Sequence, residues 1–121
     1  MTEAEVIESL NLHAANAMDA YAMFVTFTFG YLTVTFVAGD RLSIPQVLII
    51  SMLYVVSALV FSIISLLHID CFEVLLSNYP EFIYSIWWHY PWSKTLYILN
   101  IGGILASLYF MLEIQRRGDE T

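Results

Sequence analysis

The sequence contains a single cysteine and very few basic residues. Of its 121 residues, four are Lys or Arg and eleven are Asp or Glu, which gives a formal net charge of −7. Cys71 has no second cysteine with which to form an internal disulfide bond, so it indicates no redox compartment. Proteins that bind nucleic acid neutralise phosphates with a basic surface, and four bases do not supply one. We therefore expect no nucleic-acid partner.

Catalytic motifs are also absent from the sequence. There is no Gly-x-Ser-x-Gly, no His-Glu-x-x-His and no Gly-rich phosphate-binding loop. Nothing in the pattern of acids pairs two carboxyl groups as a general acid–base site would. We therefore expect a protein that is not an enzyme and that uses no cofactor.

Charged residues of either sign are scarce, whereas apolar residues are abundant. Charged residues make up 12% of the chain and hydrophobic residues 60%, against about 25% and roughly 45–50% in soluble domains. Three segments, 20–38, 47–67 and 95–112, contain no Asp, Glu, Lys or Arg. Each is close to the roughly 20 residues that a helix needs to cross a bilayer. The sequence predicts an all-α membrane protein with three transmembrane helices and one domain, 1–121.

Local signals extend the first two helices beyond the apolar segments. Thr2 and Glu5 fit a capping box, which predicts a first helix over about 3–38. Ser43 is a suitable N-cap for a second helix over about 44–77. Two long helices joined by a short loop predict an antiparallel hairpin that projects past the bilayer on the side opposite the loop.

Aromatic residues are dense between the second and third helices. The segment 79–92 includes four that we expect to anchor the chain at the membrane–water interface: Trp87, Trp88, Tyr90 and Trp92. Such rings prefer the headgroup region. This composition predicts a short interfacial helix that leads into a third long helix over about 93–116.

The few bases suggest an orientation. Arg41 lies in the first loop and Arg116 and Arg117 follow the third apolar segment, so the positive-inside rule places both regions in the cytoplasm. The N-terminus is then outside and the C-terminus inside. The first residues lack the basic region of a cleavable signal peptide, so we expect the first helix to direct insertion. The expected location is a bacterial inner membrane.

Polar and small residues recur at helical spacing in the first and third helices. The set in the first helix is Asn16, Asp19, Thr26, Gly30 and Thr33, and that in the third is Asn100, Gly103 and Ser107. Each set lies on one helical face. One interpretation is helix–helix packing, in which small residues allow close approach and hydroxyls bond between helices. The other is that these faces line an aqueous path in an oligomer, where copies of Asp19 attract cations.

The third helix also contains two overlapping pairs of small residues four positions apart. They are Gly102 with Ala106 and Gly103 with Ser107. Such pairs let helices approach closely, and packing within one chain or between copies explains them equally well. Because three helices form a thin bundle that hides few polar side chains, the polar faces favour a homo-oligomer.

The histidines and the cysteine are weak candidates for a metal site. His13, His68 and His89 all fall on the outer side of the predicted topology, and Cys71 stands one helical turn after His68. Imidazole and thiolate are ligands for zinc or copper. No dense ligand motif is present, so interfacial histidines without a metal remain the simpler interpretation.

These features lead to two functional hypotheses. The first is a homo-oligomeric membrane assembly, specifically a cation-conducting channel or pore with an acidic outer vestibule. The alternative is a non-enzymatic accessory or scaffolding subunit that packs against a larger membrane protein. The expected partners are the lipid bilayer and further copies of the chain, or that larger membrane protein.

Overall fold

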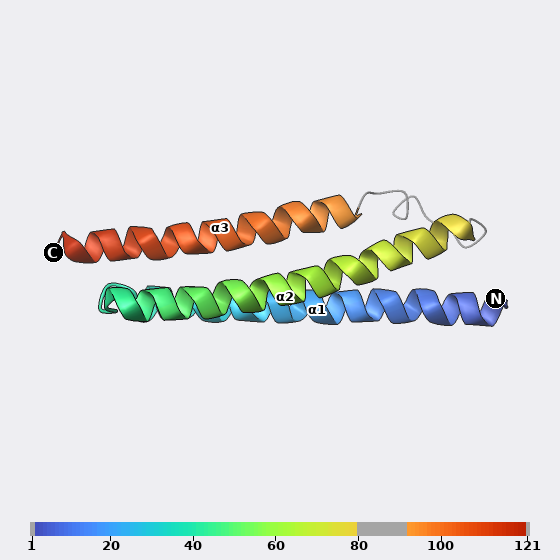
Figure 1. The fold of residues 1–121 in the computed structure, drawn as a ribbon, viewed down its shortest axis with the longest axis horizontal. Coiled ribbons are helices and arrows are strands. Elements are labelled where there is room, and N and C mark those ends of the chain that lie inside the picture. Colours follow the sequence, from blue (N-terminus) through green and yellow to red (C-terminus); the bar gives the residue numbers. More distant parts are fainter. Residues whose placement is uncertain (1, 80–91, 121) are drawn as a thin grey trace.

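The computed structural model describes residues 2–79 and 92–120, and this part of the chain is helical without any strand. Its three helices are α1 (Glu3–Ala38), α2 (Ile44–Asn78) and α3 (Trp92–Asp119) (Figure 1). Each is long enough and apolar enough to cross a membrane. The predicted set of three long apolar helices is confirmed.

Both of the first two helices begin with a capping box. The Thr2 hydroxyl accepts from the Glu5 amide at 3.2 Å, and the Thr2 amide donates to the Glu5 carboxylate at 2.8 Å. The same reciprocal pair joins Ser43 to Gln46 at the start of α2. Four amides that the helices leave without partners are therefore satisfied by local side chains.

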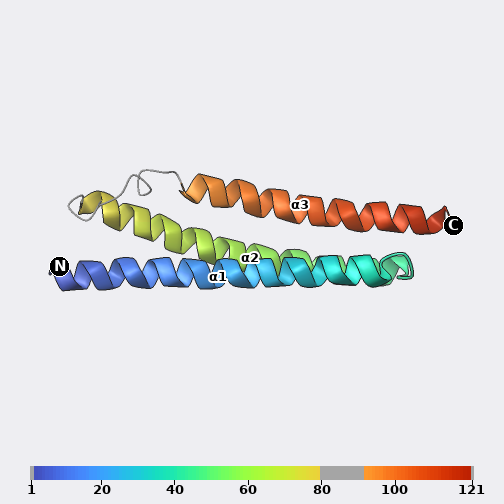
Figure 2. The same cartoon turned by 180° about the vertical axis from the view of Figure 1, so that it is seen from behind.

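Helices α1 and α2 lie side by side and run in opposite directions, as both views show (Figures 1 and 2). A central core joins all three helices through six buried residues: Phe24, Tyr31, Tyr54, Ala58, Ile104 and Met111. A second apolar cluster joins α1 to α2 near their other ends through Val6, Leu10, Phe72 and Leu76. The two helices are therefore held together along their length, beyond the point where α3 begins.

The connection between α1 and α2 is fastened to α3. The Gln115 side-chain amide donates to the carbonyl of Gly39 and, at 3.1 Å, to that of Leu42. A β-carbon at position 39 would stand 2.9 Å from the side chain of Ile114, so only glycine fits there without a shift. We call this end of the bundle, which also holds the C-terminus, the loop end, and the opposite one the N-terminal end.

The predicted interfacial helix over 79–92 lies mostly outside the described residues. Trp87, Trp88, Tyr90 and His89 belong to that part of the chain. Trp92 is the first residue of α3.

Candidate functional site

The polar residues predicted on the third helix face the interior of the bundle. Asn100 and Ser107 are 1% and 3% exposed. The Asn100 amide donates to the Ser62 hydroxyl of α2 at 2.6 Å, and the Ser107 hydroxyl donates to the carbonyl of Gly103 at 2.7 Å. A β-carbon at Gly103 would lie 3.6 Å from the Phe24 ring of α1. This face of α3 is therefore in contact with both other helices of the same chain.

The polar residues predicted on the first helix face away from the interior of the bundle. Asp19, Thr26, Gly30 and Thr33 are exposed, and Asn16 is half-buried. The hydroxyls of Thr26 and Thr33 each donate to a carbonyl one turn earlier in α1, at 2.8 Å. A β-carbon at Gly30 would meet no atom within 4 Å apart from the adjacent residues and backbone of its own helix. Packing against α2 or α3 does not account for this face, which we call the α1 polar face.

The two pairs of small residues in α3 also differ in exposure. Gly103 and Ser107 contribute to the interior, whereas Gly102 and Ala106 are exposed. A β-carbon placed at Gly102 would meet no atom within 4 Å apart from the adjacent residues and backbone of α3 itself. The two pairs therefore lie on different faces of α3, one inside the bundle and one on its surface.

A row of polar contacts joins α1 to α2 inside the bundle. The Tyr31 and Ser51 hydroxyls lie 2.8 Å apart, those of Thr28 and Tyr54 lie 3.0 Å apart, and Ser65 donates to the Ala17 carbonyl at 3.1 Å. The two tyrosine rings stack with centroids 4.3 Å apart. Because Tyr31, Ser51, Thr28, Tyr54 and Ser65 belong to uncharged segments, these bonds satisfy side-chain hydroxyls that would otherwise meet hydrocarbon.

The same row ends in a histidine pair near the N-terminal end. The Nδ1 atoms of His13 and His68 lie 3.2 Å apart, and the ring centroids lie 5.4 Å apart. A hydrogen bond between two imidazoles requires one nitrogen to donate and the other to accept. The pair is partly buried and joins residues 55 positions apart in the sequence. Sequence reasoning considered His68 beside Cys71 and did not predict its contact with His13.

A regular register explains the histidine pair. The contacts between 13 and 68, 17 and 65, 28 and 54, and 31 and 51 are all centred within one residue of Arg41. Two antiparallel helices joined by a tight turn bring together residues that are equally distant from the middle of that turn. The short connection was therefore the sequence signal for this contact.

Metal ligands do not gather around the histidine pair in the part of the chain that the structure describes. No group of three His, Cys, Asp or Glu residues stands close enough to hold an ion. Cys71 is exposed and, with His13 and Asp70, lines an open pocket of about 400 Å³ between α1 and α2. His89 lies outside the described residues.

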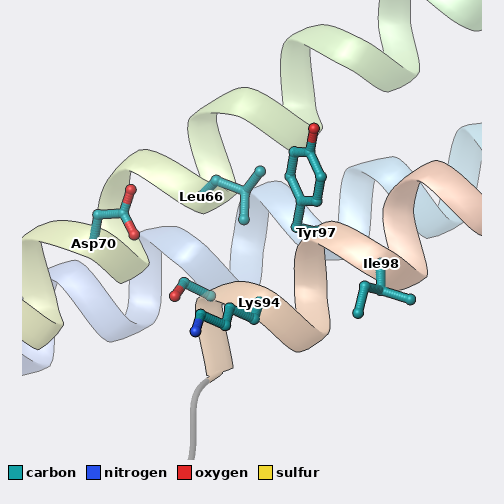
Figure 3. A pocket seen from close by; sticks show the side chains of 6 residues that line it. Leu66, Asp70, Lys94, Tyr97 and Ile98 are labelled. Atoms are coloured by element: carbon teal, nitrogen blue, oxygen red, sulfur yellow. The ribbon is translucent and has the colours of Figure 1, made fainter.

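A second pocket, of about 520 Å³, opens between α2 and α3 (Figure 3). It is lined by Leu66, Asp70, Ser93, Lys94, Tyr97 and Ile98. Beside it, the Glu73 carboxylate accepts from the Ser93 amide at 3.3 Å and from the Ser93 hydroxyl at 3.2 Å. A carboxylate at the start of a helix is favoured by the helix dipole, so Glu73 fixes the beginning of α3 against α2.

The loop end has a different charge arrangement. Glu113 forms ion pairs with Arg116 at 2.9 Å and with Arg117 at 3.3 Å. The hydrogen bond from Arg116, helped by the charges of both guanidinium groups, lowers the pKa of Glu113 below its usual value. Two bases and one acid thus form a solvent-exposed network just past the apolar segment of α3.

Comparison with protein-family models, curated proteins and solved structures finds no match for this chain. A function for this chain is therefore inferred from the contacts and charges of the bundle. The two most distinctive features of the bundle are the exposed α1 polar face and the polar residues gathered at the N-terminal end.

Proposed function

We propose that this chain is the subunit of a homo-oligomeric membrane assembly in which the α1 polar face lines a path for cations. The observation that supports this most directly is the exposure of Asp19, Thr26, Gly30 and Thr33 on the surface of the bundle. A polar face is more stable against water or a polar surface than against acyl chains. Several copies arranged around an axis would bring these faces together.

The hydroxyls of the α1 polar face suit a wet surface. Thr26 and Thr33 already donate to their own helix, so their oxygen lone pairs stay free to accept from water or to contact a cation. Asp19 stands at the N-terminal margin of the first apolar segment. A ring of such carboxylates at the mouth of a pore attracts cations and repels anions.

The proposed orientation places the N-terminal end outside and the loop end in the cytoplasm of a bacterial inner membrane. Arg41, Arg116 and Arg117 support it through the positive-inside rule. In this arrangement α1 and α2 project outward as a hairpin, with the aromatic segment 79–92 at the outer interface. The outer side then holds seven acids against one base: Glu3, Glu5, Glu8, Asp19, Asp70, Glu73 and Glu81 against Lys94. This excess of negative charge would concentrate cations near the mouth.

Native mass measurement and ion flux together test the proposal. We expect the purified protein to form an oligomer of defined size in nanodiscs and to conduct cations when reconstituted in liposomes. Asp19→Asn should lower the cation flux several-fold, whereas Glu8→Gln, an exposed acid farther from the apolar segment, should change it little. A monomer, or an oligomer without flux at any voltage or pH, would contradict the proposal.

A second function, that of an accessory subunit for a larger membrane protein, is favoured by the exposed pair Gly102 and Ala106. This pair and the α1 polar face would both allow a foreign helix to approach closely. A chain that is monomeric when purified alone and that co-purifies stoichiometrically with one other membrane protein would favour this second function.

A further inference from the structure

We propose that the pocket between α2 and α3 binds a zwitterionic phospholipid that carries a primary amine. The inference requires insertion of the chain in a membrane, but neither oligomer formation nor a cation path. It rests on two charges of opposite sign, on an apolar wall beneath them and on the fixed position of α3.

The two charges belong to different helices. The Asp70 carboxylate comes from α2 and the Lys94 ammonium from α3, and both line the same pocket (Figure 3). Both residues are exposed, and neither forms an ion pair with any residue that the structure describes. A purely anionic ligand would be attracted by Lys94 and repelled by Asp70, and a purely cationic one would meet the reverse. A ligand with an ammonium and a phosphate satisfies both groups.

Three of the other lining residues form an apolar wall on the membrane side of these charges. Leu66 belongs to the uncharged segment 47–67, and Tyr97 and Ile98 belong to 95–112. Asp70 and Lys94 stand just beyond the ends of those segments. The pocket therefore changes from charged to apolar along the direction in which a phospholipid changes from headgroup to acyl chain.

The contact between Glu73 and Ser93 leaves the Lys94 ammonium as the group that can bind the lipid phosphate. The amide and hydroxyl of Ser93 are already bonded to the Glu73 carboxylate, so an acid of the chain itself occupies the start of α3. Lys94 remains as the phosphate partner, and Asp70 as the partner of the amine. A primary ammonium donates hydrogen bonds to a carboxylate, which a trimethylammonium group does not.

Native mass spectrometry of the full chain, with defined phospholipids as probes, tests this inference. We expect phosphatidylethanolamine to be retained roughly fivefold better than phosphatidylcholine or phosphatidylglycerol, the effect of a partly screened charge contact. Asp70→Asn should abolish the preference over phosphatidylcholine and shift the order toward phosphatidylglycerol, because only the positive charge remains. Lys94→Gln should weaken retention of all three lipids.

Two controls separate binding from misfolding. Arg41→Gln changes a charge at the opposite end of the bundle from the pocket and should keep the wild-type order of lipids. The reciprocal exchange Asp70→Lys with Lys94→Asp restores both signs and should recover the preference for phosphatidylethanolamine. Equal retention of the three lipids, or an order unchanged by Asp70→Asn in a folded variant, would overturn the inference. Because cation flux is a separate readout, its failure would leave this result unaffected.

Discussion

At the scale of single residues, Asn100 shows how polar groups are held inside a thin membrane bundle. Its side chain is 1% exposed and its amide nitrogen donates to Ser62, whereas its Oδ1 atom has no hydrogen-bond partner in the described part of the chain. We expect Ser62→Ala to destabilise the fold by about 1 kcal/mol, since it leaves the buried amide without its acceptor. Unfolding in mixed micelles measures this. Thr26→Val, which removes an exposed hydroxyl bonded to its own helix, is the control and should have a smaller effect.

The histidine pair makes a prediction of the same kind. A hydrogen bond between His13 and His68 should appear as coupling between the two side chains in a double-mutant cycle. We expect His13→Ala and His68→Ala to be non-additive in unfolding free energy by about 1 kcal/mol, a typical net contribution of one hydrogen bond. Strict additivity would show that the two rings only lie near each other.

At the scale of helices, Gly30 within α1 and Gly39 at its C-terminal end should respond in opposite ways to replacement by alanine. A β-carbon at Gly39 would collide with the Thr35 carbonyl and Ile114, whereas one at Gly30 would meet open space. We expect Gly39→Ala to destabilise the monomer by roughly 1–3 kcal/mol through overpacking. Gly30→Ala should stabilise it by up to about 1 kcal/mol, because alanine favours a helix. Thermal unfolding of the two variants under identical detergent conditions gives the comparison, and a stable Gly39→Ala variant would contradict the first expectation.

The ion pairs at the end of the third helix predict a dependence on pH. Because the pKa of Glu113 is lowered by Arg116, its ion pairs stabilise the native state above the ordinary value of 4.5. This contribution is lost as the pH falls from about that value through the lower native pKa. Glu113→Gln should therefore unfold with a weaker dependence on pH in this range. The difference should shrink at high salt, since the pairs are exposed and screened.

The sequence predicted the helices better than it predicted their faces. Uncharged segments and the box formed by Thr2 and Glu5 determine that there are three helices and where the first begins. Because α1 and α2 are apolar around most of their circumference, periodicity does not distinguish the side facing lipid from the side facing the bundle. Close approach is decided by small residues such as Ala17 and Ala58, which are 2% and 0% exposed. The polar residues of α1 can be named from the sequence, but only the structure places most of them on the surface.

At the scale of the whole molecule, the bundle leaves large apolar surfaces uncovered in every direction. Most large hydrophobic residues of the three helices are exposed, among them Phe36, Met52 and Ile98 at 78%, 67% and 69%. These surfaces suit acyl chains, which need no specific contact. The α1 polar face is therefore the part of the surface that lipid covers least favourably.

This difference predicts where copies of the chain meet. In a Cys71→Ser background, a cysteine replacing Thr33 should form disulfide-linked dimers in membranes, since the α1 polar face would adjoin the same face of a neighbouring copy. A cysteine replacing Leu48, which is 61% exposed on α2 and also lies toward the loop end, should cross-link far less, because it would face lipid. Non-reducing electrophoresis after mild oxidation measures both. Equal cross-linking at the two positions would indicate random collision between copies. A higher yield at position 48 would place the contact between copies on α2. Either result would remove the α1 polar face from the proposed cation path.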